Sequence, residues 1–142
     1  MTLRVYAYAG CGTCRRALKF LTERGVAHEV LPIREQPPAV AELREMLAHV
    51  GGDVRRLFNR SGEEYRRLNL KERLPDLPEE ELLKLLASNG KLVKRPFALG
   101  KGAGAVGFKP ADWEQFARSW RAAADDRQGA RAGKRTRTSR VP

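Results

Sequence analysis

The 142-residue sequence has only two cysteines and two histidines, and this scarcity excludes several classes of protein. A structural zinc site needs about four ligands at suitable spacing. His28 and His49 are too few and too far apart to complete such a site with the cysteines. Two cysteines that lie close together also cannot cross-link a secreted, disulfide-rich scaffold. We therefore expect no bound metal and no bound cofactor.

Long hydrophobic runs are absent as well, which excludes a membrane span. The few weakly apolar residues before Cys11 are too short for the hydrophobic region of a secretory or lipoprotein signal. We therefore expect a cytoplasmic protein with no membrane partner. Hydrophobic residues make up 42% of the sequence and charged residues 32%, a composition typical of a globular domain. The length suits one domain with a substantial core.

Positive charge is in excess, with a formal net charge of +11. Residues 121–142 hold seven basic and two acidic side chains, so nearly half of the excess lies in this C-terminal segment. The segment has almost no apolar residues and cannot bury enough surface to offset its ordering entropy. We therefore expect residues 121–142 to form a disordered basic tail. Such a tail can contact nucleic acid nonspecifically or simply solubilise the chain.

Both cysteines lie in one short stretch, residues 9–16, which reads AGCGTCRR. The apolar run at 3–8 predicts a strand before it, and helix-spaced apolar residues from Cys14 to Gly25 predict a helix after it. A thiol at the start of a helix faces unpaired N–H groups and the positive end of the helix dipole, which favours the thiolate. Such a thiolate can attack an oxidant or a disulfide and then be released by its neighbour. The pair therefore indicates redox chemistry, with two merely structural cysteines as the competing interpretation.

The remaining pattern predicts a second strand at 26–33, a largely helical stretch at 39–90, and two strands at 94–99 and 105–108. We interpret the charged residues of the helical stretch as a solvated face. The glycine-rich segment 100–104 predicts a hairpin turn between the last two strands. A final amphipathic helix begins near Pro110 and presents four residues to the core: Trp113, Phe116, Ala117 and Trp120.

This order of elements resembles a thioredoxin or glutaredoxin core, an α/β fold with a four-stranded mixed sheet flanked by helices. Residues 1–38 and 91–120 would form the core, and residues 39–90 would form an all-helical insert of the same domain. Four segments make the chain similar, over residues 3–120, to the arsenate reductase (ArsC)/Spx/MgsR family. They are CGTCR at 11–15, LFNRSGEEYRRL at 57–68, LVKRP at 92–96 and VGFKP at 106–110.

The resemblance implies that Cys11 is the nucleophile, that Arg95 helps to hold an oxyanion beside it, and that Pro96 is a cis proline. A guanidinium offers a planar fork of donors to a tetrahedral anion. At the places where arsenate reductases of this family have further arginines, this chain has Asn59, with Arg60 beside it, and Lys109. The expected anion-binding or substrate-binding residues are Gly12, Thr13, Arg15, Asn59, Arg60, Arg95, Pro96 and Lys109.

Two functions from different classes follow from this resemblance. The first is a thiol–disulfide oxidoreductase in which Cys11 attacks arsenate or a related thiol-reactive oxidant. Cys14 then resolves the intermediate, and thioredoxin, glutaredoxin or glutathione supplies the electrons. The second is an Spx-like redox-sensing regulator, in which the cysteine pair is a switch and the helical insert binds the RNA polymerase alpha subunit. We favour the first, because a CxxC pair at a helix start is intrinsically competent for thiol chemistry.

Overall fold

A four-stranded sheet forms the centre of the molecule in the computed structural model, which describes residues 2–135. Its strands lie in the order β2-β1-β3-β4. Strands β1 and β2 pair in parallel, and the other two pairings are antiparallel. The strands are β1 (Leu3–Ala7), β2 (His28–Pro32), β3 (Phe97–Gly100) and β4 (Ala103–Val106). The predicted mixed sheet of a thioredoxin-like core is confirmed.

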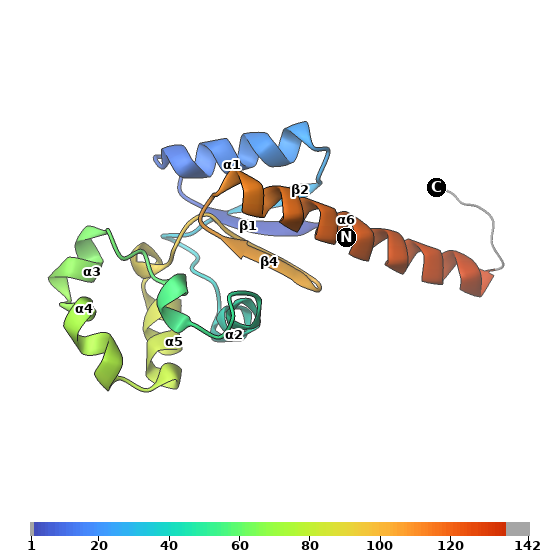
Figure 1. The fold of residues 1–142 in the computed structure, drawn as a ribbon. Coiled ribbons are helices and arrows are strands. Elements are labelled where there is room, and N and C mark those ends of the chain that lie inside the picture. The colour runs from blue at the N-terminus through green and yellow to red at the C-terminus, as the bar shows by residue number, and fades with distance from the viewer. Residues whose placement is uncertain (1, 136–142) are drawn as a thin grey trace.

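Strand β1 divides the hydrophobic core into two parts, because alternate residues of a strand point to opposite faces of the sheet. Leu3, Val5 and Ala7 are buried in one cluster, together with residues of the first and last helices. Tyr6 belongs to a second cluster on the other face, together with Phe97 and the helical insert. Helices therefore cover both faces of the sheet, as Figure 1 shows.

Helices α1 (Gly12–Glu23) and α6 (Pro110–Arg135) cover the first face, and an ion pair between Arg24 and Glu114 joins them. Four side chains of α6 are buried, as the sequence predicts: Trp113, Phe116, Ala117 and Trp120. The helix continues past residue 120, where the expected tail begins. Arg and Ala, which dominate positions 121–124, are strong helix formers, and this explains the extension beyond that point. Residues 136–142 of the expected tail lie outside the described residues.

The insert covers the opposite face of the sheet as a chain of short helices (Figure 1). It packs against the sheet through one continuous core, because its buried leucines join the cluster around Tyr6 and Phe97. Its elements are α2 (Val40–His49), η1 (Val54–Leu57), α3 (Glu63–Arg67), α4 (Leu70–Arg73), η2 (Leu74–Asp76), α5 (Glu79–Ser88) and η3 (Gly90–Leu92).

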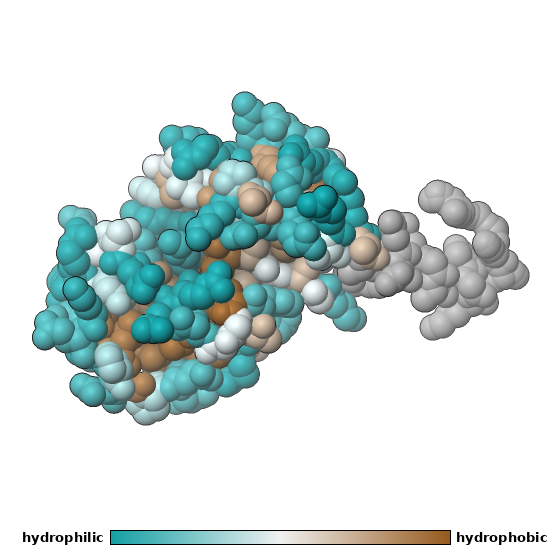
Figure 2. Space-filling view, in the orientation of Figure 1, coloured by the Kyte–Doolittle hydropathy of each residue, from teal (hydrophilic) through white to brown (hydrophobic). Residues whose placement is uncertain are grey.

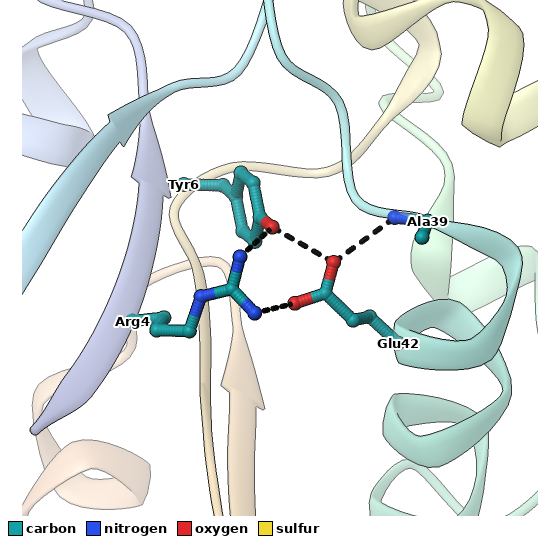
Figure 3. A network of polar contacts seen from close by, with 4 residues as sticks. All are labelled: Arg4, Tyr6, Ala39 and Glu42. Atoms are coloured by element: carbon teal, nitrogen blue, oxygen red, sulfur yellow. Dashed lines mark hydrogen bonds and ion pairs between the residues drawn. The ribbon is translucent and has the colours of Figure 1, made fainter.

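A polar network fixes the insert to the central strand (Figure 3). The Glu42 carboxylate, on the first turn of α2, accepts hydrogen bonds from Arg4 at 2.6 Å and from the Tyr6 hydroxyl at 2.8 Å. It also accepts the backbone N–H of Ala39 at 3.0 Å. One carboxylate therefore caps the helix and ties it to β1.

Several predicted boundaries differ from the structure: β2 spans His28–Pro32 rather than 26–33, and β4 spans Ala103–Val106 rather than 105–108. The thiol helix begins at Gly12, directly after Cys11. The third strand begins only at Phe97, because the preceding residues form a loop around a cis Arg95–Pro96 bond. The hairpin turn lies at residues 101–102, where Gly102 has a φ of +85°.

The surface in the view of Figure 2 is mainly hydrophilic. Apolar residues show through over the helical insert, at the lower left of this view. Across residues 2–135, the helices are too short or too polar to cross a membrane.

Candidate functional site

The two cysteines lie where β1 ends and α1 begins. Cys11 is the residue that precedes the first turn of α1, and its N–H donates to the Tyr8 carbonyl at 3.0 Å. Its carbonyl accepts the Arg15 N–H at 3.1 Å, which starts the helical hydrogen bonding. The Cys11 side chain therefore stands at the positive end of the helix, as the sequence predicts.

Partial burial of the Cys11 thiol opposes its ionisation, yet the pKa of Cys11 lies below the ordinary thiol value. The backbone N–H groups of Cys14 and Thr13, the Cys14 thiol and the Arg95 guanidinium all donate toward the sulfur and outweigh the burial. The sulfur makes no cap hydrogen bond of standard geometry, so its stabilisation is a sum of several electrostatic contacts. The thiolate therefore forms more readily at this position than in an ordinary cysteine.

Cys14 has the opposite character. Burial raises the pKa of Cys14 to about 11, and the neighbouring Cys11 sulfur raises it further. The Tyr8 N–H, which donates to the Cys14 sulfur at 3.5 Å, only partly offsets this. Both cysteines are free thiols in the structure, with Cys14 only 1% exposed. The pair thus combines an ionisable outer thiol with a protonated inner thiol that can donate to it.

Backbone hydrogen bonds tie the Arg95–Pro96 loop to two other segments of the chain. This peptide bond is cis, as the family resemblance implies, and the Pro96 carbonyl accepts the Gly107 N–H at 2.9 Å. On the other side, the Lys94 N–H donates to the Leu57 carbonyl at 2.8 Å. These bonds join three of the segments that carry the resemblance, those at 57–68, 92–96 and 106–110, into one wall.

A cleft of about 880 Å³ lies between this wall and Cys11. Its lining carries eight basic and three acidic side chains, so anions are attracted to it. The acidic side chains are Glu63, Glu64 and Asp112, and the basic ones are Arg34, Arg55, Arg56, Arg60, Lys91, Lys94, Arg95 and Lys109. The Arg95 Nη1 atom is buried and has no hydrogen-bond partner among the described residues. An anion bound beside Cys11 would give this donor a partner.

The structure brings most of the predicted site residues together. Besides Cys11, five of them line the cleft: Thr13, Asn59, Arg60, Arg95 and Lys109. The other four, the buried Cys14 among them, lie off the cleft wall. Gly12 is the first residue of α1, and Pro96 is buried behind Arg95. The exposed Arg15 turns back and donates to the Ala9 carbonyl at 3.0 Å.

Asn59 lines the cleft, but its carbonyl and its side chain both contact Gly62 within the same turn. The Gly62 N–H donates to the Asn59 carbonyl at 3.1 Å. A Cβ atom on Gly62 would lie only 2.7 Å from the Asn59 amide nitrogen, so this side chain packs directly over the glycine. The neighbouring Arg60, which is exposed, is therefore the residue of this turn that brings positive charge to the cleft.

Several basic residues of the site are missed by sequence reasoning. Arg34 follows β2, Arg55 and Arg56 lie on η1, and Lys91 and Lys94 flank the end of η3. The helical pattern predicts a solvated face for the charged residues of the insert, yet Arg55 and Arg56 line the cleft. Within the sequence, only the motifs at 57–68 and 92–96 indicate that these residues approach the cysteines. In residues 2–135, no group of three or more His, Cys, Asp or Glu side chains is arranged to hold a metal ion.

The fold and the cysteine pair define a protein of the thioredoxin-like class whose CxxC motif faces a cationic cleft. Within that class, the chain belongs to the ArsC family, whose model matches residues 6–116. The resemblance found in the sequence is thus confirmed.

Individual relatives cover most of the chain. The uncharacterized protein YusI of Bacillus subtilis is 45% identical over 120 residues, which span 84% of this chain and 99% of YusI. An arsenate reductase of Neisseria meningitidis is 31% identical over 106 residues, 74% of this chain and 89% of that protein. The global transcriptional regulator Spx of Enterococcus faecalis is 25% identical over 114 residues, 80% of this chain and 85% of Spx.

Among solved structures, an ArsC family related protein from Bacteroides fragilis is similar, with a TM-score of 0.77 and 40% sequence identity. The match covers 82% of this chain and 98% of that protein.

Proposed function

We propose that this protein is a thiol–disulfide oxidoreductase in which Cys11 is the nucleophile and Cys14 the resolving thiol. One observation carries the proposal, namely the opposite character of the two thiols. The pKa of Cys11 is lowered, whereas burial raises the pKa of Cys14 to about 11. The attacking group is therefore ionised first, and the second thiol keeps its proton until an intermediate has formed.

The reaction with a disulfide takes two steps. The Cys11 thiolate attacks one sulfur of the substrate, which forms a mixed disulfide and releases the other sulfur as a thiolate. Cys14 then loses its proton to solvent, and its sulfur attacks the Cys11 sulfur. This breaks the mixed disulfide, releases the second substrate thiolate and leaves a Cys11–Cys14 disulfide. Two electrons have passed from the protein to the substrate, and two thiol groups of a reductant return them.

Arsenate fits the same sequence of steps. Cys11 sulfur bonds to As(V) with loss of water, and attack by Cys14 on the Cys11 sulfur leaves the bonding electron pair on arsenic, which departs as As(III). Arg95 stabilises the oxyanion, because it lines the cleft with Cys11 and its buried Nη1 donor has no partner among the described residues. Arg60 and Lys109 add positive charge from the cleft wall. Thioredoxin, glutaredoxin or glutathione is the proposed electron donor, which places the protein in the reducing cytoplasm.

Replacing each cysteine by serine in a purified, reductant-coupled assay tests the proposal. Cys11→Ser should abolish reduction of arsenate and of a small disulfide. In Cys14→Ser, Cys11 should still form the covalent intermediate with the substrate. Turnover should then stop if the reductant supplied cannot attack that intermediate. Full activity in Cys11→Ser would refute the proposal.

The Spx relative supports a second proposal, a redox-sensing regulator with little turnover. Here the Cys11–Cys14 disulfide alters a surface of the helical insert that binds the RNA polymerase alpha subunit. The insert shares one core with the sheet, which gives a route for such coupling. A pull-down of the alpha subunit under peroxide and under reductant tests this idea, and identical binding in the two conditions would exclude the switch.

A further inference from the structure

Tyr8 contacts each of the groups that make up the thiol site. Its N–H donates to the Cys14 sulfur at 3.5 Å, and its carbonyl accepts the Cys11 N–H at 3.0 Å. Its ring lies near two guanidinium groups, with the central carbon of Arg34 at 3.7 Å and that of Arg95 at 5.4 Å from the ring centroid. The backbone of Tyr8 thus holds the cysteines, while its side chain faces the arginines.

The Tyr8 ring is itself held in place. A Cβ atom on Gly10 would lie 2.8 Å from Cε2 of the ring, so the loop glycine packs tightly against it. The guanidinium of Arg34 lies over the ring as well. Cations are attracted to an aromatic face by the ring quadrupole, and Arg34 therefore adds to this packing. The ring is a fixed platform beside the cleft.

Arg95 needs such a platform, because it lines the cleft together with Cys11 and its buried Nη1 donor has no partner among the described residues. An acidic side chain would also fix an arginine, but it would neutralise the charge and occupy its donors. None of the ion pairs found among residues 2–135 involves Arg95. A ring contact positions the guanidinium and leaves its N–H groups available.

We infer that Tyr8 is a positioning residue, whose ring holds the Arg95 guanidinium toward the Cys11 sulfur and keeps a donor free for an incoming anion. This inference rests on the proposed function, since it assigns Tyr8 a role in the activation of Cys11. It does not make Tyr8 a catalytic residue, because the ring acts only through Arg95.

The rate of Cys11 alkylation against pH tests the inference, measured by mass spectrometry in the full chain. Four proteins form a cycle: the wild type, Tyr8→Leu, Arg95→Met, and the double variant. Tyr8→Phe keeps the ring and is the conservative control. Gly10→Ala displaces the ring without altering Tyr8 and serves as a second route if Tyr8→Leu fails to fold.

The expected result is a higher Cys11 pKa in Tyr8→Leu, with alkylation about twofold to tenfold slower at a fixed pH below that pKa. Gly10→Ala should shift the profile in the same direction, and Tyr8→Phe should retain the wild-type profile. In the Arg95→Met background, Tyr8→Leu should have no further effect. An equal shift in both backgrounds, or no shift in either, would overturn the inference. An ordinary thiol pKa in the wild type would instead refute the proposed function, so the two failures are distinguishable.

Discussion

Replacing Glu42 by alanine removes the centre of the network that ties the insert to the sheet. Glu42 accepts hydrogen bonds from Arg4, from the Tyr6 hydroxyl and from the N–H of Ala39. Tyr6 is 3% exposed, so water cannot fully replace the hydrogen bond that its hydroxyl donates to Glu42. A hydrogen bond to a charged group contributes about 1.5–3 kcal/mol, and an exposed ion pair such as that with Arg4 adds at most about 1 kcal/mol. We expect Glu42→Ala to lower the free energy of unfolding by about 2–4 kcal/mol.

Urea denaturation followed by circular dichroism measures this loss as a lower midpoint at unchanged slope. Glu45→Ala is the matched control, because Glu45 is an exposed glutamate on the same helix. Both variants replace glutamate by alanine, so the change in helix propensity is the same in each. We expect the control to change stability by no more than about 0.5 kcal/mol. Equal losses in the two variants would refute the role assigned to Glu42.

The network around Glu42 should also make the stability of the protein depend on pH in the alkaline range. Burial, followed by the hydrogen bond and the charge of Glu42, raises the pKa of Tyr6 from 10.0 to about 12, although Arg4 acts in the opposite direction. A group whose folded pKa is raised binds more protons when folded than when unfolded. Its stabilisation is therefore complete below pH 10 and is lost as the pH rises toward 12. Tyr6→Phe should remove this part of the pH dependence, and an unchanged alkaline profile would contradict the assignment.

Two further predictions concern the resolving thiol of Cys14 and the close packing of Gly90 against Ile33. Cys14→Ser should accumulate a one-to-one mixed disulfide on Cys11 when treated with a small disulfide, visible by intact-mass spectrometry, whereas rapid turnover without such an adduct would exclude Cys14 as the resolving group. Gly90→Ala should lower the free energy of unfolding by at least about 2 kcal/mol in a thermal melt, because its Cβ would lie 1.9 Å from the Ile33 carbonyl oxygen, a backbone atom with little freedom to move. A melting temperature equal to that of the wild type would contradict this close packing.

Local patterns were enough to predict the core of the fold. The apolar run of β1, the glycines around the hairpin and the aromatic side of α6 each depend on near neighbours in the sequence, and all agree with the structure. The boundaries were less predictable. The loop before β3 contains apolar and basic residues that predict a strand, but this segment pairs with residues 57–58 instead of with the sheet.

The cleft depends on contacts between distant segments, and the sequence predicts it only in part. The sequence motifs identify Cys11 and Arg95, and the family resemblance implies that the two residues lie close together. Arg34 has no motif, and its position over Tyr8 depends on how the chain leaves β2. Arg55 and Arg56 reach the cleft because η1 is joined to the segment before Arg95 by the Phe58–Val93 bridge. The sequence around a charged residue on a short helix does not show that the helix pairs with a distant segment.

The apparent pKa of the Cys11 thiol, obtained from its alkylation rate against pH in the wild-type protein, tests the central claim most directly. Cys14 is buried and its pKa is raised to about 11, so the two thiols can be followed separately by peptide mass spectrometry. We predict that Cys11 ionises below the free-thiol value of about 8.5 and reacts well before Cys14. A Cys11 pKa at or above that value would contradict an activated thiolate at the start of α1.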